Sequence, residues 1–355
     1  MPIEQAVPHR EEQYSTASTW LGVAGLCAAT IFAARKFLRT PPRHFELRGK
    51  VVLITGGSRG LGLALANELG SRGARLALCA RDKAELEKAC ASLRESGIEA
   101  YSFPADVTKT SEVPELANRI ANQLGSIDVL VNNAGRISVG SFDSLTHEDY
   151  EAAMDLMFWA PVNLTYAVLP HMRAKGSGKI VNITSIGGRV SVPHLLPYSC
   201  AKFALVGFSN GLTVELKKKG IDVLTVVPGL MRTGSYLNAE FKGAAKQEFA
   251  WFGVLGNLPG FSVAAGRAAK EICNAIMEGK DIWTISVPAK VLVALEALVP
   301  EINRTVFEAA NRFALPDSQA KESVQGKHLN PSFNLLFQGL TTLGRLAAQR
   351  YNESR

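Results

Sequence analysis

A glycine-rich stretch between a short apolar run and a helix-length segment restricts the fold of this chain more than any other feature. The run Val51–Thr55 leads directly into Thr-Gly-Gly-Ser-Arg-Gly-Leu-Gly at residues 55–62, and a helix is expected to open near Gly60. Glycines there allow a tight turn and let a pyrophosphate approach the backbone at the N-terminus of the helix. Such a stretch alone is weak evidence, but its place between strand and helix predicts a dinucleotide-binding βαβ unit.

The same alternation of short apolar runs and helix-length segments continues along the chain. Further strands are expected at residues 75–80, 100–103, 129–132, 180–184 and 223–227, with a last edge strand at 283–287. Helices are expected between them, notably at residues 84–96, 147–172 and 197–218. Strands buried on both faces consist of continuous Val, Ile and Leu runs, as here. The pattern predicts an α/β fold with a Rossmann-type, doubly wound parallel sheet over residues 48–287.

Residues 17–34 are the one stretch typical of a targeting segment. They carry no charge but are short for a span, which takes about 20 apolar residues. Acidic residues precede the stretch and basic residues follow it, the reverse of a signal peptide. We therefore expect a membrane anchor within residues 1–47, with the following domain on the cytoplasmic side. A helix lying on the membrane surface, or a cleaved or soluble segment, are the alternatives.

From about residue 288 the pattern changes to amphipathic helices, interrupted at Pro300. Two apolar stripes recur at helical spacing. They are Val291, Leu295, Leu298, Ile302, Val306 and Phe313, then Phe333, Leu336, Phe337, Leu340, Leu343 and Ala347. Residues 288–355 are therefore expected to form a helical extension that packs on the main domain or contacts a membrane.

Charge and cysteine content exclude several classes of protein. The chain has a net charge of +7, and the basic excess is concentrated at residues 35–50, beside the apolar stretch. This position favours a membrane flank over a nucleic-acid binding site. The five cysteines are scattered without metal-ligand spacing or a disulfide framework. We expect no nucleic-acid partner, no metal and a reducing compartment.

The preferred cofactor is indicated about 20 residues beyond the glycine stretch. At that point an acidic side chain would hold a ribose hydroxyl, whereas an arginine would hold a 2′-phosphate. Ala80 takes the expected acidic position, and Arg81 and Arg59 could both reach a phosphate, which favours NADP(H). In the alternative, both arginines are solvated and Asp82 points back toward a ribose.

Four motifs in a fixed order now identify a family resemblance. They are the glycine stretch, Asn-Asn-Ala-Gly at 132–135, Ser185 thirteen residues before Tyr-Ser-Cys-Ala-Lys at 198–202, and Pro-Gly-Leu-Met-Arg-Thr at 228–233. Over roughly residues 48–285 the chain resembles the short-chain dehydrogenases/reductases. The resemblance implies nicotinamide hydride transfer, with Ser185, Tyr198 and Lys202 as catalytic residues. It also implies cofactor contacts from Gly56, Ser58, Arg59, Gly60, Leu61, Gly62, Arg81, Asp106, Val107, Asn133, Ala134, Gly135, Tyr198, Lys202, Pro228, Gly229 and Thr233.

These residue types suit the reduction of a carbonyl, which needs hydride at carbon, a proton, and donors aimed at the oxygen. A free tyrosine has a pKa near 10, and a lysine four residues later lies on the same helical face, where its charge favours the phenolate. We therefore expect Tyr198 to donate the proton, Lys202 to lower its pKa and hold the nicotinamide ribose, and Ser185 to bind the carbonyl oxygen. Met157 stands where the family has an asparagine, so either the proton relay is altered or Met157 fills a core gap.

The segment after Thr233 is rich in aromatic residues, namely Tyr236, Phe241, Phe249, Trp251 and Phe252. Such a lining suits a hydrophobic ligand. We expect an NADPH-dependent reductase of a lipid-like aldehyde or ketone, with His194 in the loop or pocket wall. The alternatives are an NAD-dependent alcohol or hydroxysteroid-type dehydrogenase working oxidatively, and a dinucleotide-binding scaffold without catalysis. The family resemblance also leaves room for a homo-oligomer.

Overall fold

The computed structural model describes residue 30, residues 44–329 and residues 335–353. The chain divides into two units, Met1–Arg43 and His44–Arg355, and the fold below is that of the second. Apart from Thr30, the expected anchor at residues 17–34 lies outside the described residues.

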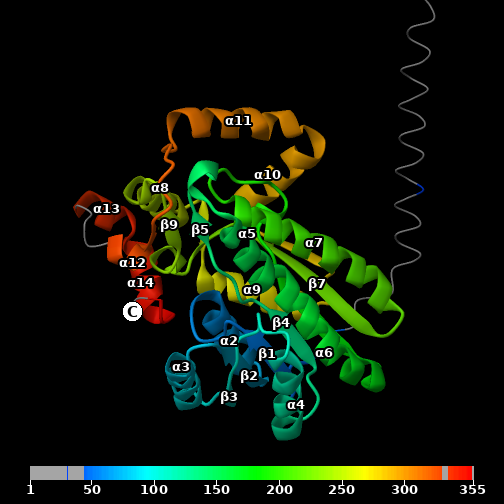
Figure 1. The fold of residues 1–355 in the computed structure, drawn as a ribbon. Coiled ribbons are helices and arrows are strands. Elements are labelled where there is room, and N and C mark those ends of the chain that lie inside the picture. The colour runs from blue at the N-terminus through cyan, green and yellow to red at the C-terminus, as the bar shows by residue number, and fades with distance from the viewer. Residues whose placement is uncertain (1–29, 31–43, 330–334, 354–355) are drawn as a thin grey trace, which may run out of the picture. The chain divides into compact units, whose positions relative to one another are not determined.

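A seven-stranded parallel sheet forms the centre of the molecule (Figure 1). Its strands, from one edge to the other, are β11 (Ile282–Ile285), β7 (Ile221–Pro228), β6 (Gly178–Ile183), β4 (Val129–Asn132), β1 (Val51–Thr55), β2 (Arg75–Ala80) and β3 (Ala100–Pro104). The strand order reverses between β1 and β4, and ligands of open α/β sheets bind outside the carboxyl ends of the strands at this point. The predicted doubly wound α/β sheet is confirmed, with strand ends displaced by up to two residues.

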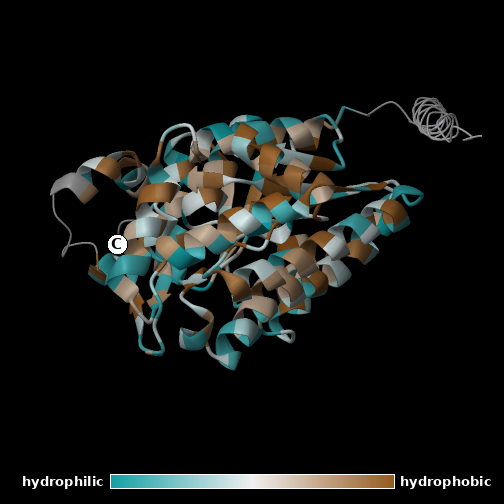
Figure 2. Cartoon of the chain, turned by 90° about the horizontal axis from the view of Figure 1, so that it is seen from above, coloured by the Kyte–Doolittle hydropathy of each residue, from teal (hydrophilic) through white to brown (hydrophobic). Residues whose placement is uncertain are grey.

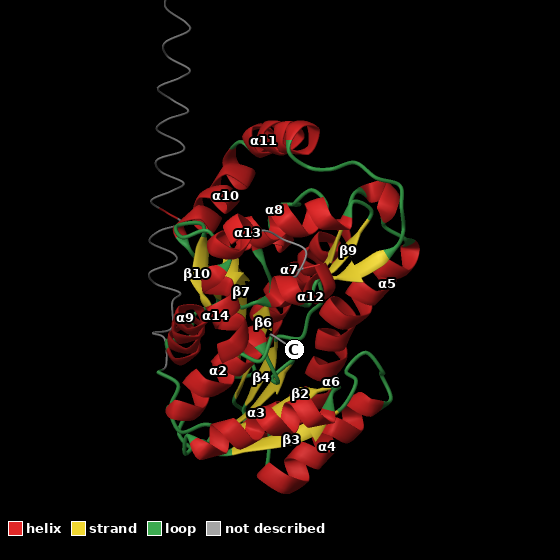
Figure 3. Cartoon of the chain, turned by 90° about the vertical axis from the view of Figure 1, so that its left-hand side faces the viewer, coloured by secondary structure: helices red, strands yellow, loops and turns green. Residues whose placement is uncertain are grey.

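Helices cover both faces of the sheet, as Figure 3 shows with α9 and α2 on one side and α6 and α4 on the other. They are α2 (Gly60–Ser71), α3 (Lys83–Glu95), α4 (Glu112–Leu124), α5 (His147–Met154), α6 (Ala160–Lys175), α7 (Leu196–Lys217) and α9 (Ala265–Met277). Strand β1 shows why two layers form. Val52 and Ile54 face the core with α2, α3 and α9, whereas Val51 and Leu53 face the core with α4, α6 and α7. Side chains that alternate between two apolar faces require helices on both.

One helical run among the described residues, His147–Lys175, is long and apolar enough to cross a membrane. It comprises α5, a π-helical turn at Asp155–Trp159 and α6. Half of its most apolar window is buried against the rest of the fold, so it is a core helix.

Two small sheets beyond the main sheet were not expected from the sequence. Strands β5 (Ser138–Val139), β9 (Glu240–Lys242) and β12 (Ser323–Gln325) form one small sheet, and β8 (Leu230–Arg232) pairs with β10 (Ser262–Ala264). The remaining helices are α8 (Ala245–Asn257), α10 (Val287–Leu298), α11 (Pro300–Phe313), α12 (Gly326–Leu329), α13 (Leu335–Leu340) and α14 (Thr342–Arg350). Because β12 pairs with β9, the C-terminal region shares a sheet with the segment after Thr233.

The C-terminal helices differ in how they meet the main domain. Phe337 on α13 and Ala348 on α14 are buried with residues of α8. By contrast, α10 and α11 leave apolar side chains exposed, including Leu298 at 79% and Phe313 at 79%. The hydropathy colours in Figure 2 show that hydrophobic and polar stretches alternate along the helices, as expected where a helix covers a sheet with only one face.

Candidate active site

Ser185, Tyr198 and Lys202 meet at the carboxyl end of β6. Ser185 stands two residues beyond the end of that strand, is buried, and accepts a hydrogen bond from the Gly187 amide at 3.0 Å. The Tyr198 hydroxyl hydrogen-bonds to Ser185. Lys202 lies one turn further along α7, where its Nζ donates to the carbonyl of Ile183 at 2.8 Å and lies 5.8 Å from the Tyr198 ring centroid. The structure therefore brings the three predicted catalytic residues together.

A glycine allows the turn after Ser185 to pack against α7. A Cβ added at Gly188 would lie 2.6 Å from the Lys202 carbonyl oxygen, closer than real Cβ atoms come. Gly187 also packs against α7, since a Cβ added there would lie 3.1 Å from Cε1 of the Tyr198 ring. The Ser-Ile-Gly-Gly sequence at 185–188 thus fixes both the serine and the helix that carries the tyrosine.

Burial controls the protonation of both titratable residues. It lowers the pKa of Lys202 to about 8. It raises the pKa of Tyr198, and the Ser185 hydrogen bond opposes this only in part. The pKa of Tyr198 thus responds to burial and to Ser185, and the effect of Lys202 on it stays a prediction. The Lys202 ammonium donates to the Ile183 carbonyl and lies beside the Tyr198 ring.

Buried hydrogen bonds hold α7 against the sheet. Asn132 on β4 donates to Asn182 on β6 at 2.8 Å, Asn182 donates to Ser209 on α7 at 3.0 Å, and the hydroxyls of Ser209 and Thr225 lie 2.6 Å apart. All four side chains are buried. In a low-dielectric interior such a chain fixes one arrangement of the elements that carry it.

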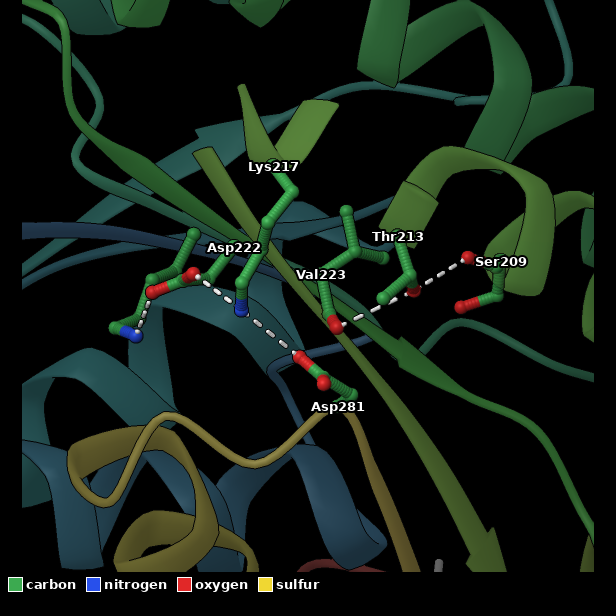
Figure 4. Close-up of polar contacts among 7 residues, drawn as sticks. Ser209, Thr213, Lys217, Asp222, Val223 and Asp281 are labelled. Carbon is green, nitrogen blue, oxygen red and sulfur yellow. Dashed lines mark hydrogen bonds and ion pairs between the residues drawn. The ribbon is translucent and has the colours of Figure 1, made fainter. Parts of the chain in front are cut away.

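Ion pairs hold the C-terminal end of α7 against the sheet (Figure 4). Lys217 donates to Asp222 on β7 at 3.2 Å and to Asp281, which precedes β11, at 3.1 Å. Thr213 lies between the two anchor points and donates to the Ser209 carbonyl at 2.9 Å. Helix α7 is thus held at its middle and at its end, so Tyr198 and Lys202 have a rigid support.

The glycine stretch and the Asn-Asn-Ala-Gly strand end interlock at the β1/β4 position. The hydroxyl of Thr55 accepts from the amides of Asn133 and Ala134 at 3.0 and 3.1 Å, and the Asn133 side chain donates to the Thr55 carbonyl at 2.9 Å. Gly60 opens α2 with φ +57°, a conformation that favours glycine. This is the cradle in which a Rossmann fold holds a pyrophosphate, so the residues present fit a dinucleotide.

At the expected adenosine end of the cradle, Ser58 and Arg59 contact an acidic side chain, whereas Arg81 is exposed. Ser58 donates to Glu85 on α3 at 2.5 Å, and Arg59 lies 3.5 Å from the same carboxylate. Arg81 is exposed at the end of β2. Asp82 caps α3 by accepting from the Glu85 amide at 2.9 Å, so it is not turned toward a ribose.

Asp106 lies near the start of the loop between β3 and α4. Burial raises its pKa, but hydrogen bonds from Thr108 and the charge of Arg81 outweigh this effect, and the pKa of Asp106 is lowered. Val107 beside it is buried. Across the cradle, Pro228 ends β7 and leads through Gly229 to the buried Thr233. The predicted cofactor residues thus surround the carboxyl ends of β1, β2, β4 and β7.

Most of the aromatic residues after Thr233 form a packed core instead of an open lining. Tyr236, Phe241 and Phe249 are at most 4% exposed. The rings of Phe241 and Phe249 lie 5.3 Å apart, and Phe337 of α13 lies 5.4 Å from Phe249. Aromatic rings at these distances stabilise the fold by packing on one another. Only Trp251 and Phe252 of the five are partly exposed, so the prediction of an aromatic pocket lining is wrong for the other three.

Met157 lies in the π-helical turn between α5 and α6. It is fully buried and packs with Ala153 and Ala201, with its sulfur near Gly135. Ala201 immediately precedes Lys202 on α7. Met157 therefore fills a core gap under the catalytic helix, as one of the two predicted interpretations had it.

His194, expected in a loop or pocket wall, connects the loop before Tyr198 to two other helices. It adopts a left-handed backbone with φ 61° and is buried. Its Nδ1 lies 2.6 Å from Glu248 on α8, and its Nε2 lies 3.1 Å from Asn311 on α11. The loop before Tyr198 is therefore bonded to the C-terminal region, a connection that no sequence motif indicated.

The comparisons with known proteins agree with this site. A family model described as short chain dehydrogenase matches residues 50–240. A dehydrogenase/reductase SDR family member 7B from Danio rerio is 30% identical over 304 residues, which are 82% of this chain and 96% of that protein. A fatty acyl-CoA reductase from Acinetobacter baylyi is 35% identical over 53% of this chain and 64% of its own length.

Solved structures give the same result. A short-chain dehydrogenase from Streptomyces avermitilis matches with TM-score 0.63 and 30% identity, covering 74% of this chain and 98% of its own. L-Sorbose reductase from Gluconobacter frateurii, solved with NADPH and L-sorbose, matches with TM-score 0.61 and 27% identity over 68% of this chain and 97% of its own. The chain belongs to the short-chain dehydrogenase/reductase family and is an NAD(P)-dependent oxidoreductase.

Proposed function

We propose that this protein is an NADPH-dependent reductase that converts a hydrophobic, lipid-like aldehyde or ketone into an alcohol. The observation that carries the proposal is the meeting of Ser185, Tyr198 and Lys202 at the carboxyl end of β6, beside the dinucleotide cradle. A bound nicotinamide cofactor would supply the hydride. The protein must then supply a proton and stabilise charge on the carbonyl oxygen.

In this mechanism Tyr198 gives its hydroxyl proton to the substrate oxygen, and Ser185 donates a hydrogen bond to the same atom. The Ser185 hydroxyl is hydrogen-bonded to Tyr198, so one oxygen can lie within reach of both. Lys202, whose pKa of about 8 leaves it mostly charged at neutral pH, favours the phenolate that Tyr198 becomes. By family resemblance, we expect the Lys202 ammonium also to hold the cofactor ribose.

Arg81 supports the preference for NADPH. It is exposed at the end of β2 next to Ala80, where an NAD-binding protein would carry an acidic residue. Asp82, the rival for a ribose contact, is engaged at the N-terminus of α3. Dissociation constants for NADPH and NADH on the same protein test this preference, and tighter binding of NADH would favour the oxidative alternative.

Two observations support a lipid-like substrate. One relative of the chain is named as a fatty acyl-CoA reductase, and α10 and α11 expose apolar side chains, including Leu298 and Phe313. The test is a series of aldehydes and ketones of increasing chain length, followed by NADPH oxidation. We expect kcat/KM to rise with chain length because remote apolar contacts contribute binding energy. A flat series would exclude a lipid-like substrate, and no turnover at all would favour the non-catalytic scaffold.

We also propose that residues 17–34 anchor the protein to a membrane with the catalytic domain facing the cytoplasm. The uncharged stretch followed by basic residues supports this orientation. Deleting residues 1–34 should move the protein from the membrane fraction to the supernatant and preserve carbonyl reduction. Continued sedimentation with membranes would instead assign attachment to the exposed faces of α10 and α11.

A further inference from the structure

The start of α2, where a pyrophosphate would be held, is occupied by the chain itself. The Gly60 amide donates to the Tyr351 carbonyl at 2.8 Å. The face of Gly60 that lacks a Cβ lies against the Glu353 carboxyl group, and a Cβ there would collide with its Oε1. In dinucleotide-binding loops this glycine is the one that lets the pyrophosphate approach the backbone. Residues 351–353 therefore use the same donor and the same free space.

The contact extends to the second cofactor loop. The Asn238 side chain donates to the Glu353 carbonyl at 3.0 Å and to its carboxyl at 2.5 Å. Gly234, next to Thr233, lies against Glu353 and Ala348. On the glycine side, the Asn352 side chain donates to the Ser58 carbonyl at 3.3 Å. The segment therefore bridges the two loops between which a dinucleotide would lie.

We propose that residues 351–353 form an intramolecular plug that competes with the pyrophosphate of NADPH, so that cofactor binding requires the plug to move. The inference rests on the proposed function because it assumes that the cradle binds NADPH. It adds a determinant of cofactor affinity that none of the family motifs contains.

The structure also shows which part of the plug can move. The Tyr351 side chain is buried in the core with α2 and α9, so it anchors the segment. Asn352 has φ 56°, a left-handed conformation that asparagine adopts more readily than most residues. Glu353 is only 7% exposed. Releasing Asn352 and Glu353 removes the cost of burying a carboxyl group. The Tyr351 side chain can stay buried while its carbonyl gives up the Gly60 amide.

The electrostatic surroundings favour an uncharged carboxyl group in the plug. Burial raises the pKa of Glu353 to about 7, Arg59 acts to lower it, and Glu85 acts to raise it. The hydrogen bond from Asn238 also acts to lower the pKa of Glu353, but burial outweighs both opposing effects. Below about pH 7 the docked group is thus mainly protonated and fills the space by contact and hydrogen bonding.

The experiment compares NADPH binding to the full-length wild type and to Glu353→Ala at about pH 6.5, followed by fluorescence. The variant loses the carboxyl group and its bond to Asn238. If the plug is docked in about nine molecules of ten, removing it tightens NADPH binding about tenfold. Adenosine 2′-phosphate, which carries the 2′-phosphate but no pyrophosphate, should bind both proteins equally. Glu308→Ala, at an exposed site on α11, is the matched control and should bind NADPH as the wild type does.

Hydrogen exchange provides a second readout that does not depend on the variant folding normally. Amides of residues 351–353 should exchange faster when NADPH is bound to the wild type. Slower exchange would show that the segment closes over the cofactor and would overturn the proposal. An unchanged or weaker NADPH affinity in Glu353→Ala would overturn it as well, while leaving the proposed function intact. Failure of the wild type to bind NADPH would overturn both.

Discussion

Replacing Lys202 by methionine should make this protein more stable while abolishing its proposed activity. The Lys202 residue is 4% exposed, and burial lowers its pKa from an ordinary value of 10.5 to about 8. At one pKa unit per 1.36 kcal/mol, the charged form costs the folded state about 3 kcal/mol at neutral pH. Methionine keeps the length of the side chain without the charge. It leaves the Ile183 carbonyl without its donor, which costs about 1 kcal/mol, so the net gain is about 2 kcal/mol.

The pH dependence of this effect has a defined sign. Between about pH 8 and about pH 10.5 the unfolded chain keeps a proton on Lys202 that the folded chain releases, so the stability of the wild type rises with pH across that window. The penalty is fully present below about pH 8. The difference between wild type and Lys202→Met should therefore be largest at pH 7 and should shrink toward pH 10.

Urea unfolding followed by circular dichroism measures this difference directly. The matched control is Lys218→Met, at an exposed position at the end of the same helix, which should leave the free energy of unfolding nearly unchanged. A Lys202→Met protein that is less stable than the wild type at pH 7 would refute the reasoning. It would show that the hydrogen bond to Ile183 outweighs the cost of burying the charge.

Three further outcomes are expected. Tyr198→Phe should lower kcat by at least about 100-fold with the NADPH dissociation constant unchanged, because only the transferable proton is lost; a substantial residual rate would exclude Tyr198 as the acid. Arg81→Asp should weaken NADPH at least about tenfold and spare NADH, measured as dissociation constants, and an unchanged preference would shift the role to Arg59. Because docking raises the pKa of Glu353 to about 7, docking takes up a proton and weakens as pH rises through that value. NADPH should therefore bind the wild type more tightly than Glu353→Gln at about pH 8, and the difference should shrink as pH falls toward the ordinary Glu353 pKa of 4.5; identical pH profiles would contradict this.

The main sheet was predictable because its strands and motifs leave local signals. Val51–Thr55 is a continuous apolar run, and the structure buries all five residues. Tyr198 and Lys202 stand four residues apart, so a helix places both side chains on one face. Ser185 was located by its distance from Tyr198, and the structure joins the two by a hydrogen bond.

Other parts of the site depend on contacts between distant segments, which composition does not reveal. The sequence cannot distinguish whether Phe241 and Phe249 line a pocket or fill a core. In the structure Phe337 packs against Phe249, so these rings form part of the core. His194 and Asn311 are 117 residues apart, and neither belongs to a periodic pattern. The direction of the Tyr198 pKa shift likewise depends on burial, which no sequence motif reveals.

These distant contacts change what removal of residues 288–355 would do. The sequence alone leaves open whether this region packs on the main domain or contacts a membrane. In the structure, however, Phe337 packs against the core ring of Phe249, Tyr351 is buried with α2 and α9, and β12 pairs with β9. Exposing these surfaces removes large buried apolar contacts of the catalytic domain, each worth about 3–5 kcal/mol for an aromatic side chain. We therefore expect loss of soluble, folded protein, measured by gel filtration and circular dichroism. A folded truncation that still bound NADPH would show that the catalytic domain is stable without this region.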